Sequence, residues 1–182
     1  MGKFFSESPL PIFSPAQKSC CRSTLISAMN IKLEKADECD AEKIISIRNQ
    51  CFYDDYVQFG ECPGYNIPKE QVIKRIQQGH LYKIVIDNEI AGDVSVHILD
   101  SGVHWIGCAA VAKKFQNRGI GSFAMKEIEK LYSKAIVWQL ETPLSNIRNC
   151  HFYKKLGYEV IDTKILTDKL TLGVFEKTKN TL

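Results

Sequence analysis

The segment from Ile106 to Ser122 constrains the fold of this chain more than any other part of its sequence. It opens with the run Ile106–Val111, which is apolar throughout and is typical of a central strand covered on both faces. A basic, polar arm follows, and Gly119 and Gly121 then open a stretch with apolar residues at helical spacing. Glycine lets a backbone approach a ligand oxygen closely, and free N–H groups at a helix start attract anions. The segment therefore predicts a strand, a turn and a helix that together hold a phosphate or pyrophosphate group.

Two kinds of phosphate-binding fold compete for this segment. The stretch from Gly119 to Ala124 also fits the dinucleotide fingerprint G-x-G-x-x-G/A, and Glu141 lies roughly where a ribose-binding acid stands. In that motif the glycines follow the strand almost directly, whereas a polar arm from Lys113 to Arg118 intervenes here. A doubly wound domain also needs several further strand–helix–strand units, and only about 40 residues follow Glu141. A dinucleotide-binding protein is therefore the weaker interpretation.

Composition sets the size of the chain and excludes several classes of protein. With 182 residues, of which 45% are hydrophobic and 25% charged, it has the make-up of one soluble domain. The net charge of +3 excludes a globally basic nucleic-acid binder, and no apolar stretch approaches the roughly 20 residues of a membrane span. The 7 cysteines are odd in number and include no C-x-x-C pair. The 4 histidines have no metal-ligand spacing and are interpreted as surface or strand residues: His80, His97, His104 and His151. We therefore expect a cytoplasmic protein with no metal, no membrane partner and no nucleic-acid partner.

The remaining patterns predict a mixed α/β (α+β) fold with a central, mostly antiparallel sheet of six to seven strands and about four helices. Alternation and short apolar runs predict strands at residues 31–34, 82–86, 90–98, 103–111, 135–140, 158–166 and 170–176. Start and stop signals predict helices that begin after Asp37 or Asp40, and at Pro68, Gly119 and Asn146. Residues 52–67 are interpreted as an aromatic, acidic loop. Residues 1–28 are rich in Ser and Pro and are predicted to be a disordered N-terminal extension, so that the domain spans residues 29–182.

Together with a second segment, the arm and glycine turn resemble the GNAT superfamily of acyl-CoA N-acyltransferases, whose best-known members are N-acetyltransferases. The acyl-CoA-binding signature of that family, Q/R-x-x-G-x-G/A, stands here as Gln116-Asn117-Arg118-Gly119-Ile120-Gly121. The family's other half is matched by an asparagine, Asn146, that precedes by six residues the run Phe152-Tyr153-Lys154-Lys155-Leu156-Gly157-Tyr158. The resemblance covers roughly Ile31 to Lys177.

The resemblance implies how acetyl-CoA is held. The strand that ends at Val111 is expected to splay from the next strand and to pair with the pantetheine arm. Asn146 is expected to contact the pantetheine or to align the last helix. Tyr153 is expected to stand near the thioester sulfur as general acid. The pyrophosphate is expected to bind the backbone N–H groups of Gln116, Asn117, Arg118, Gly119, Ile120, Gly121 and Ser122.

The sequence departs from the family pattern at the general base. Many members carry an acid in the strand before the arm, but Gly107 and Cys108 occupy that stretch here. Glu141, at the end of the following strand, is the carboxylate left on a core element, and it is the predicted base. Ordered water is the alternative. Asn149 stands where a small residue is frequent, which alters the expected contacts to CoA.

The sequence thus predicts an N-acetyltransferase that transfers the acetyl group of acetyl-CoA to a primary amine of a small molecule or peptide by direct attack. A non-catalytic acyl-CoA-binding or regulatory module on the same fold is the second hypothesis, and a dinucleotide-binding protein is the third. The acceptor amine is unidentified, and a monomer and a homodimer are both compatible with the sequence. Acidic and aromatic residues that are candidates to line a pocket for a cationic amine are Asp54, Asp55, Tyr56 and Glu61.

Overall fold

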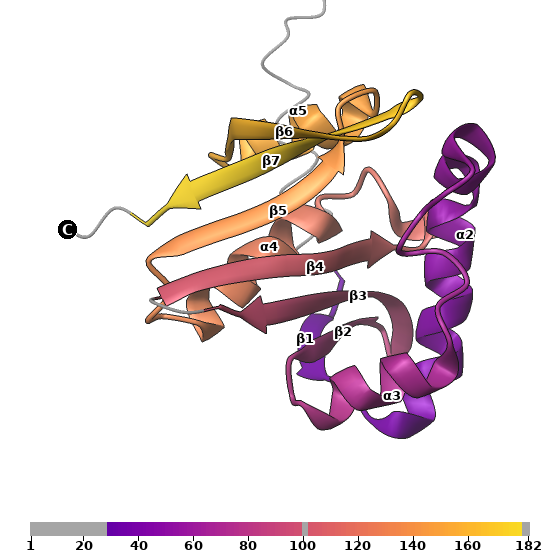
Figure 1. Cartoon of the computed structure of the whole chain (residues 1–182). Helices are drawn as coiled ribbons and strands as arrows, with labels where there is room; N and C mark the ends of the chain where they lie inside the picture. Colours follow the sequence, from indigo (N-terminus) through magenta and orange to yellow (C-terminus); the bar gives the residue numbers. More distant parts are fainter. Residues whose placement is uncertain (1–28, 100–101, 180–182) are drawn as a thin grey trace, which may run out of the picture.

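One mixed sheet organises the part of the chain that the structure describes (Figure 1). The structure is a computed structural model and describes residues 29–99 and 102–179. In these residues the strand order is β1-β2-β3-β4-β5-β7-β6, with β1 (Ile31–Lys35), β2 (Leu81–Ile86), β3 (Glu89–Ile98), β4 (Val103–Val111), β5 (Val137–Pro143), β6 (Glu159–Thr167) and β7 (Leu170–Thr178). Neighbouring strands are antiparallel except for β4 and β5. The predicted mixed, mostly antiparallel sheet is confirmed. It is not the parallel, doubly wound sheet of a dinucleotide-binding domain.

Helices cover both faces of this sheet. In the described residues the α-helices are α2 (Ala41–Phe59), α3 (Lys69–Gln77), α4 (Ile120–Leu131) and α5 (Ile147–Lys155), and the short 3-10 turns are η1 (Glu38–Asp40) and η3 (Lys113–Phe115). On the face that we call the α2 face, α2 and α3 pack together around Ile44 and Val72. On the opposite face, the α4 face, α4 and α5 enclose the largest core cluster, which contains Ile128, Tyr153 and Phe175. The expected number of about four helices is confirmed for the described part of the chain.

Helix α2 is longer than the sequence pattern indicates. It continues to Phe59, so the prediction of a loop is wrong for residues 52–59. The helix ends at Gly60, whose φ is 77° and whose N–H donates to the Tyr56 carbonyl at 2.8 Å. The side chains of Tyr53 and Val57 are exposed, so this half of the helix carries no continuous apolar stripe. The missing stripe explains why hydrophobic periodicity does not detect the extension.

The ends of the predicted domain are only partly described. The predicted N-terminal extension, residues 1–28, lies outside the described residues. Met29, where the predicted domain begins, packs against the core cluster of the α4 face. Among residues 29–99 and 102–179, no helix combines the length and the apolar character that a membrane crossing requires.

Gly92 in β3 allows an unusually close approach of the β4 backbone. A Cβ built on Gly92 would lie 2.1 Å from the Ala110 carbonyl oxygen, far inside van der Waals distance. Because the oxygen belongs to strand backbone, we expect Gly92→Ala to push β3 away from β4. Overpacking of this kind lowers the free energy of unfolding by about 2–3 kcal/mol. Urea unfolding followed by circular dichroism measures the loss.

Gly121→Ala is the matched control for this substitution. Its Cβ would lie 3.2 Å from Cζ of Phe152, at the far end of a side chain. Since alanine is also the better helix former, the free energy of unfolding should change by less than about 1 kcal/mol. Equal unfolding midpoints for wild type and Gly92→Ala would show that the strand contact does not constrain this position.

Candidate active site

Strands β4 and β5 pair at one end and separate at the other. Their parallel pairing ends at Ile106 and Leu140, whereas β4 continues to Val111 and β5 to Pro143. On its other side β4 stays paired with β3 up to Val111. The last part of β4 therefore has a backbone edge inside the sheet that faces no strand. The splay that the resemblance implied is confirmed.

The backbone of Val111 faces this opening. The next residue, Ala112, donates its N–H to the Ala91 carbonyl at 2.8 Å on the β3 side, and successive residues of a strand point their backbone groups in opposite directions. The Val111 carbonyl accepts hydrogen bonds from Gln116 Nε2 at 2.7 Å and from Cys51 Sγ at 3.2 Å. Side chains of the arm and of α2 thus occupy the carbonyl that faces the opening.

The arm between β4 and α4 ends in a turn that leaves helix N–H groups free. Asn117 and Gly119 have left-handed φ values of 62° and 83°. The first helical hydrogen bond runs from the Phe123 N–H to the Gly119 carbonyl at 2.9 Å, and no side chain caps this helix start. The N–H groups from Ile120 to Ser122 therefore point out of the helix at the positive end of its dipole. The geometry suits an anionic group, as the sequence predicts.

Arg148 in α5 joins the arm to the last helix, and the sequence reasoning missed it. Its Nη2 donates to Gln116 Oε1 at 2.9 Å and to Asn117 Oδ1 at 3.4 Å. Its guanidinium therefore lies beside the predicted pyrophosphate site. The available signal was its position two residues after Asn146 in the second family segment.

Two lysines of the arm form ion pairs with other elements, and Gly121 lies against a ring of α5. Lys113 pairs with Asp54 at 3.1 Å and Lys114 pairs with Glu89 at 2.6 Å, so these cations are directed at other elements. Gly121, expected to be small so that a ligand oxygen can approach, has the ring of Phe152 next to its missing Cβ. Its small size also permits the close packing of α5 against α4.

Asn146 performs one of the two roles that were expected of it. It is the N-cap of α5, and its Oδ1 accepts from the Asn149 N–H at 3.2 Å. Asp55 of α2 lies beside it: burial and the nearby charge of Asp54 raise the pKa of the Asp55 carboxyl, while a hydrogen bond from Asn146 acts in the opposite direction. Asn149 itself donates to Thr142 Oγ1 of β5 at 3.4 Å. Asn146 therefore aligns α5 and brings it close to the end of α2.

Tyr153 is held in an aromatic cluster on the α4 face. It is buried, and its ring lies 5.1 to 6.0 Å between centroids from Phe152, Tyr158 and Phe175. Burial raises the pKa of the Tyr153 phenol above its ordinary value. The group is therefore protonated at neutral pH, which is the state that a proton donor requires.

Glu141 lies on the other face of the sheet from Tyr153. Its neighbours Leu140 and Thr142 are buried, and Leu140 belongs to the α4-face core, so alternation points Glu141 towards the α2 face. Lys164 of β6 pairs with the Glu141 carboxylate, and its Nζ lies 5.8 Å from the ring centroid of Trp105 in β4. The two predicted catalytic residues, Tyr153 and Glu141, therefore lie on opposite faces of the sheet.

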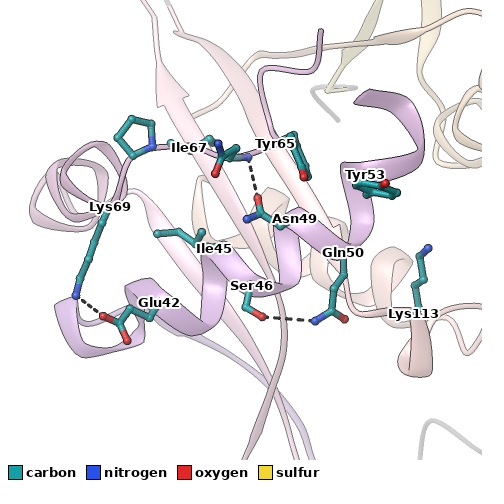
Figure 2. A pocket seen from close by; sticks show the side chains of 12 residues that line it. Glu42, Ile45, Ser46, Asn49, Gln50, Tyr53, Tyr65, Ile67, Lys69 and Lys113 are labelled. Atoms are coloured by element: carbon teal, nitrogen blue, oxygen red, sulfur yellow. Dashed lines mark hydrogen bonds and ion pairs between the residues drawn. The ribbon is translucent and has the colours of Figure 1, made fainter. Parts of the chain in front are cut away.

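A separate groove lies on the outer side of α2 (Figure 2). It has a volume of about 1090 Å³, and its walls include Asn49 and Tyr53 of α2 and Tyr65 of the segment before α3. Asn49 Oδ1 accepts from the Asn66 N–H at 2.8 Å and ties that segment to the helix. No residue of β4 or β5 lines the groove, so the groove is distinct from the splay. The four residues proposed for an acceptor pocket are likewise absent from its lining: Asp54, Asp55, Tyr56 and Glu61.

Known proteins share both the sequence pattern and the fold. A family model described as the Acetyltransferase (GNAT) family matches residues 41–158. The uncharacterized protein YrkN of Bacillus subtilis is 26% identical over 136 residues, which is 71% of this chain and 74% of YrkN.

Two solved structures illustrate the likeness of the fold. The PaiA N-acetyltransferase of Thermoplasma acidophilum, in complex with coenzyme A, superposes with a TM-score of 0.70 at 18% identity and covers 82% of this chain and 99% of its own. The putative acetyltransferase yncA of Salmonella typhimurium, with its cofactor acetyl-CoA, gives 0.65 at 14% identity, with coverage of 82% and 94%. At these identities the likeness concerns the fold.

Proposed function

Because the chain belongs to the GNAT family of acetyltransferases, we propose that it transfers the acetyl group of acetyl-CoA to a primary amine by direct attack. The observation that carries this proposal is the splay between β4 and β5, which opens beside the free N-terminus of α4. Similar folds are solved with coenzyme A and with acetyl-CoA, which supports this donor. The acceptor is a primary amine of a small molecule or of a peptide.

The donor would bind along the open edge of β4 and across the start of α4. A pantetheine amide would donate to the Val111 carbonyl in place of Gln116 Nε2, which holds it at 2.7 Å. The pyrophosphate would accept from the N–H groups between Gln116 and Ser122, with Arg118 and Arg148 as the nearby cations. Asn146 would align α5 so that Tyr153 reaches the sulfur.

The chemistry requires a protonated amine to lose two protons, one before attack and one as the C–N bond forms, and the sulfur to gain one. An amine of pKa about 10.4 is protonated at pH 7, so freeing its lone pair costs roughly 4 to 5 kcal/mol. The lone pair then attacks the thioester carbon, and the C–S bond breaks with its electrons on sulfur. Tyr153 would donate its proton to that sulfur. Glu141 and ordered water are the candidates that the sequence offers for the base, and the Glu141 carboxylate faces Lys164.

A thiol-release assay with acetyl-CoA and a panel of amines tests this function. We expect CoA to be released with at least one amine class, and mass spectrometry to show that the amine gains one acetyl group. Saturable acetyl-CoA binding without thiol release from any amine would favour the non-catalytic module. Saturable NAD binding without CoA binding would restore the dinucleotide interpretation.

Arg148→Ala should weaken donor binding without changing the chemical step. Its loss removes the hydrogen bonds to the Gln116 and Asn117 side chains and one cation next to the pyrophosphate site. We expect the KM for acetyl-CoA to rise about fivefold, since an exposed hydrogen bond of this kind contributes modestly, with kcat nearly constant. Because salt screens exposed charges, the effect should shrink at high ionic strength.

Lys154→Ala, on the exposed side of the same helix, is the control for Arg148→Ala. It removes the same charge from α5 but makes no contact with the arm. A rise in KM of equal size in both variants would indicate a general charge effect and would remove Arg148 from the donor site.

A further inference from the structure

Gly107 marks an uncovered point in the middle of the central strand. Ser95 of β3 pairs with Cys108 and Val96 pairs with Ile106, so Gly107 is an extra residue of β4 and forms a β-bulge. Gly107 is exposed, although Ile106 and Cys108 on either side of it are buried. It stands at the place where the two strands begin to separate. The bulge therefore opens the sheet surface to solvent at the start of the splay.

The imidazole of His97 fills the space that a side chain at Gly107 would occupy. A Cβ built on Gly107 would lie 2.5 Å from His97 Nε2, 2.7 Å from its Cδ2 and 3.2 Å from Ser95 Oγ. The ring of His97 is only partly buried. Ser95 Oγ is buried and has no hydrogen-bond partner in the described structure, so it is free to hold a water beside the ring. One ring nitrogen of His97 thus lies directly over Gly107, where β4 and β5 begin to separate.

His97 lies on the α2 face of the sheet. Asp93, Ser95 and His97 alternate along β3, and Asp93 pairs with Arg48 of α2, so all three point to the α2 face. His97 pairs across the strands with Trp105, whose ring also lies 5.8 Å from Lys164 Nζ. This is the face opposite Tyr153. A donor bound between the two faces would have a proton donor on one side and an imidazole on the other.

The charges around His97 favour its neutral form. Burial lowers the pKa of the His97 imidazole below its ordinary 6.5, and the neighbouring Arg75 of α3 and His80 ahead of β2 lower it further. Beyond Trp105 on the same face, Glu141 and Lys164 pair with each other. A neutral imidazole at pH 7 is able to accept a proton.

We propose that His97 is the general base that takes the proton of the attacking amine, an inference that rests on the proposed acetyl transfer. The amine enters after losing one proton to solvent, and its lone pair forms the C–N bond. The nitrogen becomes more acidic as this bond forms, and its second proton passes to His97, directly or through one water. The C–S bond breaks, and the sulfur takes the proton of Tyr153. His97 then returns its proton to solvent and Tyr153 regains one, so that the products are the amide and CoA.

The pH profile of kcat/KM distinguishes a base from a structural residue. For wild type we expect activity to fall as the pH drops through the lowered pKa of His97, because the imidazole becomes protonated there. His97→Gln should reduce kcat/KM about 10²-fold at neutral pH and remove the additional fall in activity that His97 protonation causes, leaving only the slope from the amine's own titration. The loss relative to wild type should shrink towards about pH 9.5, where hydroxide compensates for the missing base. Binding of acetyl-CoA, measured by calorimetry, should stay unchanged.

Two matched variants and one rescue complete the experiment. His151→Gln, an exposed histidine of α5, should retain wild-type kinetics at every pH. Glu141→Gln should keep the acidic limb. His97→Gly opens a cavity over Gly107, and added imidazole should restore part of its rate.

The opposite outcomes overturn the inference in distinguishable ways. An equal loss for His97→Gln at all pH values would make His97 a structural residue. A pH-dependent loss in Glu141→Gln, with none in His97→Gln, would assign the base to Glu141. Absence of thiol release by the wild type with every amine would refute the proposed function itself, and this inference with it.

Discussion

Tyr153→Phe should lower kcat about 10²-fold or more while leaving the KM for acetyl-CoA nearly constant. The hydroxyl is the only group removed, and a positioned proton donor contributes about 10²–10⁴ in rate. The ring stays in its cluster with Phe152, Tyr158 and Phe175, so the fold and the donor site should persist. Steady-state thiol release measures kcat, and calorimetry measures donor affinity.

The protonation state of Tyr153 also determines how the activity should depend on pH. Burial raises the pKa of the phenol, so the donor stays protonated through the alkaline range. Tyr153 should therefore contribute no loss of activity as the pH rises to about 10. Wild type and Tyr153→Phe should accordingly differ by a constant factor over that range.

Tyr158→Phe is the control for Tyr153→Phe. Tyr158 is a buried tyrosine in the same cluster, and its hydroxyl donates to Glu129 Oε1 at 3.2 Å. We expect this variant to lose about 1 kcal/mol of stability and to keep its kcat. Wild-type kcat in Tyr153→Phe would contradict the donor role and would leave Tyr153 as a packing residue.

Asp93→Asn should strongly lower the free energy of unfolding, because it breaks a buried ion pair. Asp93 and Arg48 are almost completely buried, and Arg48 Nε lies 3.1 Å from each Asp93 carboxylate oxygen. The variant leaves the Arg48 guanidinium as a buried charge without its counter-ion. Loss of one partner of a buried ion pair costs about 3–5 kcal/mol. Urea unfolding should show the corresponding fall in midpoint.

Replacing both partners separates this charge effect from the loss of packing. The double variant Arg48→Met with Asp93→Leu removes both charges and fills the space with apolar groups. Such replacements are often neutral or stabilising, so the double variant should recover most of the stability lost in Asp93→Asn. If the double variant is as unstable as Asp93→Asn, the pair is required for its geometry and not for its charge balance.

The parts of the fold that the sequence predicts are those with a strong local signal. The apolar run to Val111, the glycines that open α4 and the Asn146 cap each specify a strand or a helix end within a few residues. The strand–helix–strand order of residues 103–140 also indicates the parallel pairing that β4 and β5 show. The sequence pattern does not predict the second half of α2, because residues such as Tyr53 and Val57 are exposed and form no apolar stripe.

The parts of the site that the sequence does not predict depend on contacts between distant segments. Lys113 forms an ion pair with Asp54 of α2, and Arg148 donates a hydrogen bond to Gln116 of the arm. No local sequence pattern indicates either contact. His97 has no spacing that indicates a site, and it becomes notable only because a bulge places Gly107 beneath its ring. Chemistry at this site is therefore a property of the assembled sheet.

The splay also has a mechanical consequence. Among the described residues, the β1–β4 part of the sheet is joined to the β5–β7 part by four residue pairs, from Val103 with Val137 to Ile106 with Leu140, and by the adjacent hydrogen bond from the Ile136 N–H to the Gly102 carbonyl. A donor that bonds to β4 and lies against α5 would connect the two parts of the sheet a second time, at the end where β4 and β5 are not paired. The free energy of unfolding should then rise with donor concentration by RT ln(1 + [L]/Kd), and the unfolding temperature should rise with it. The molecule would be most rigid at the moment when its substrate is in place.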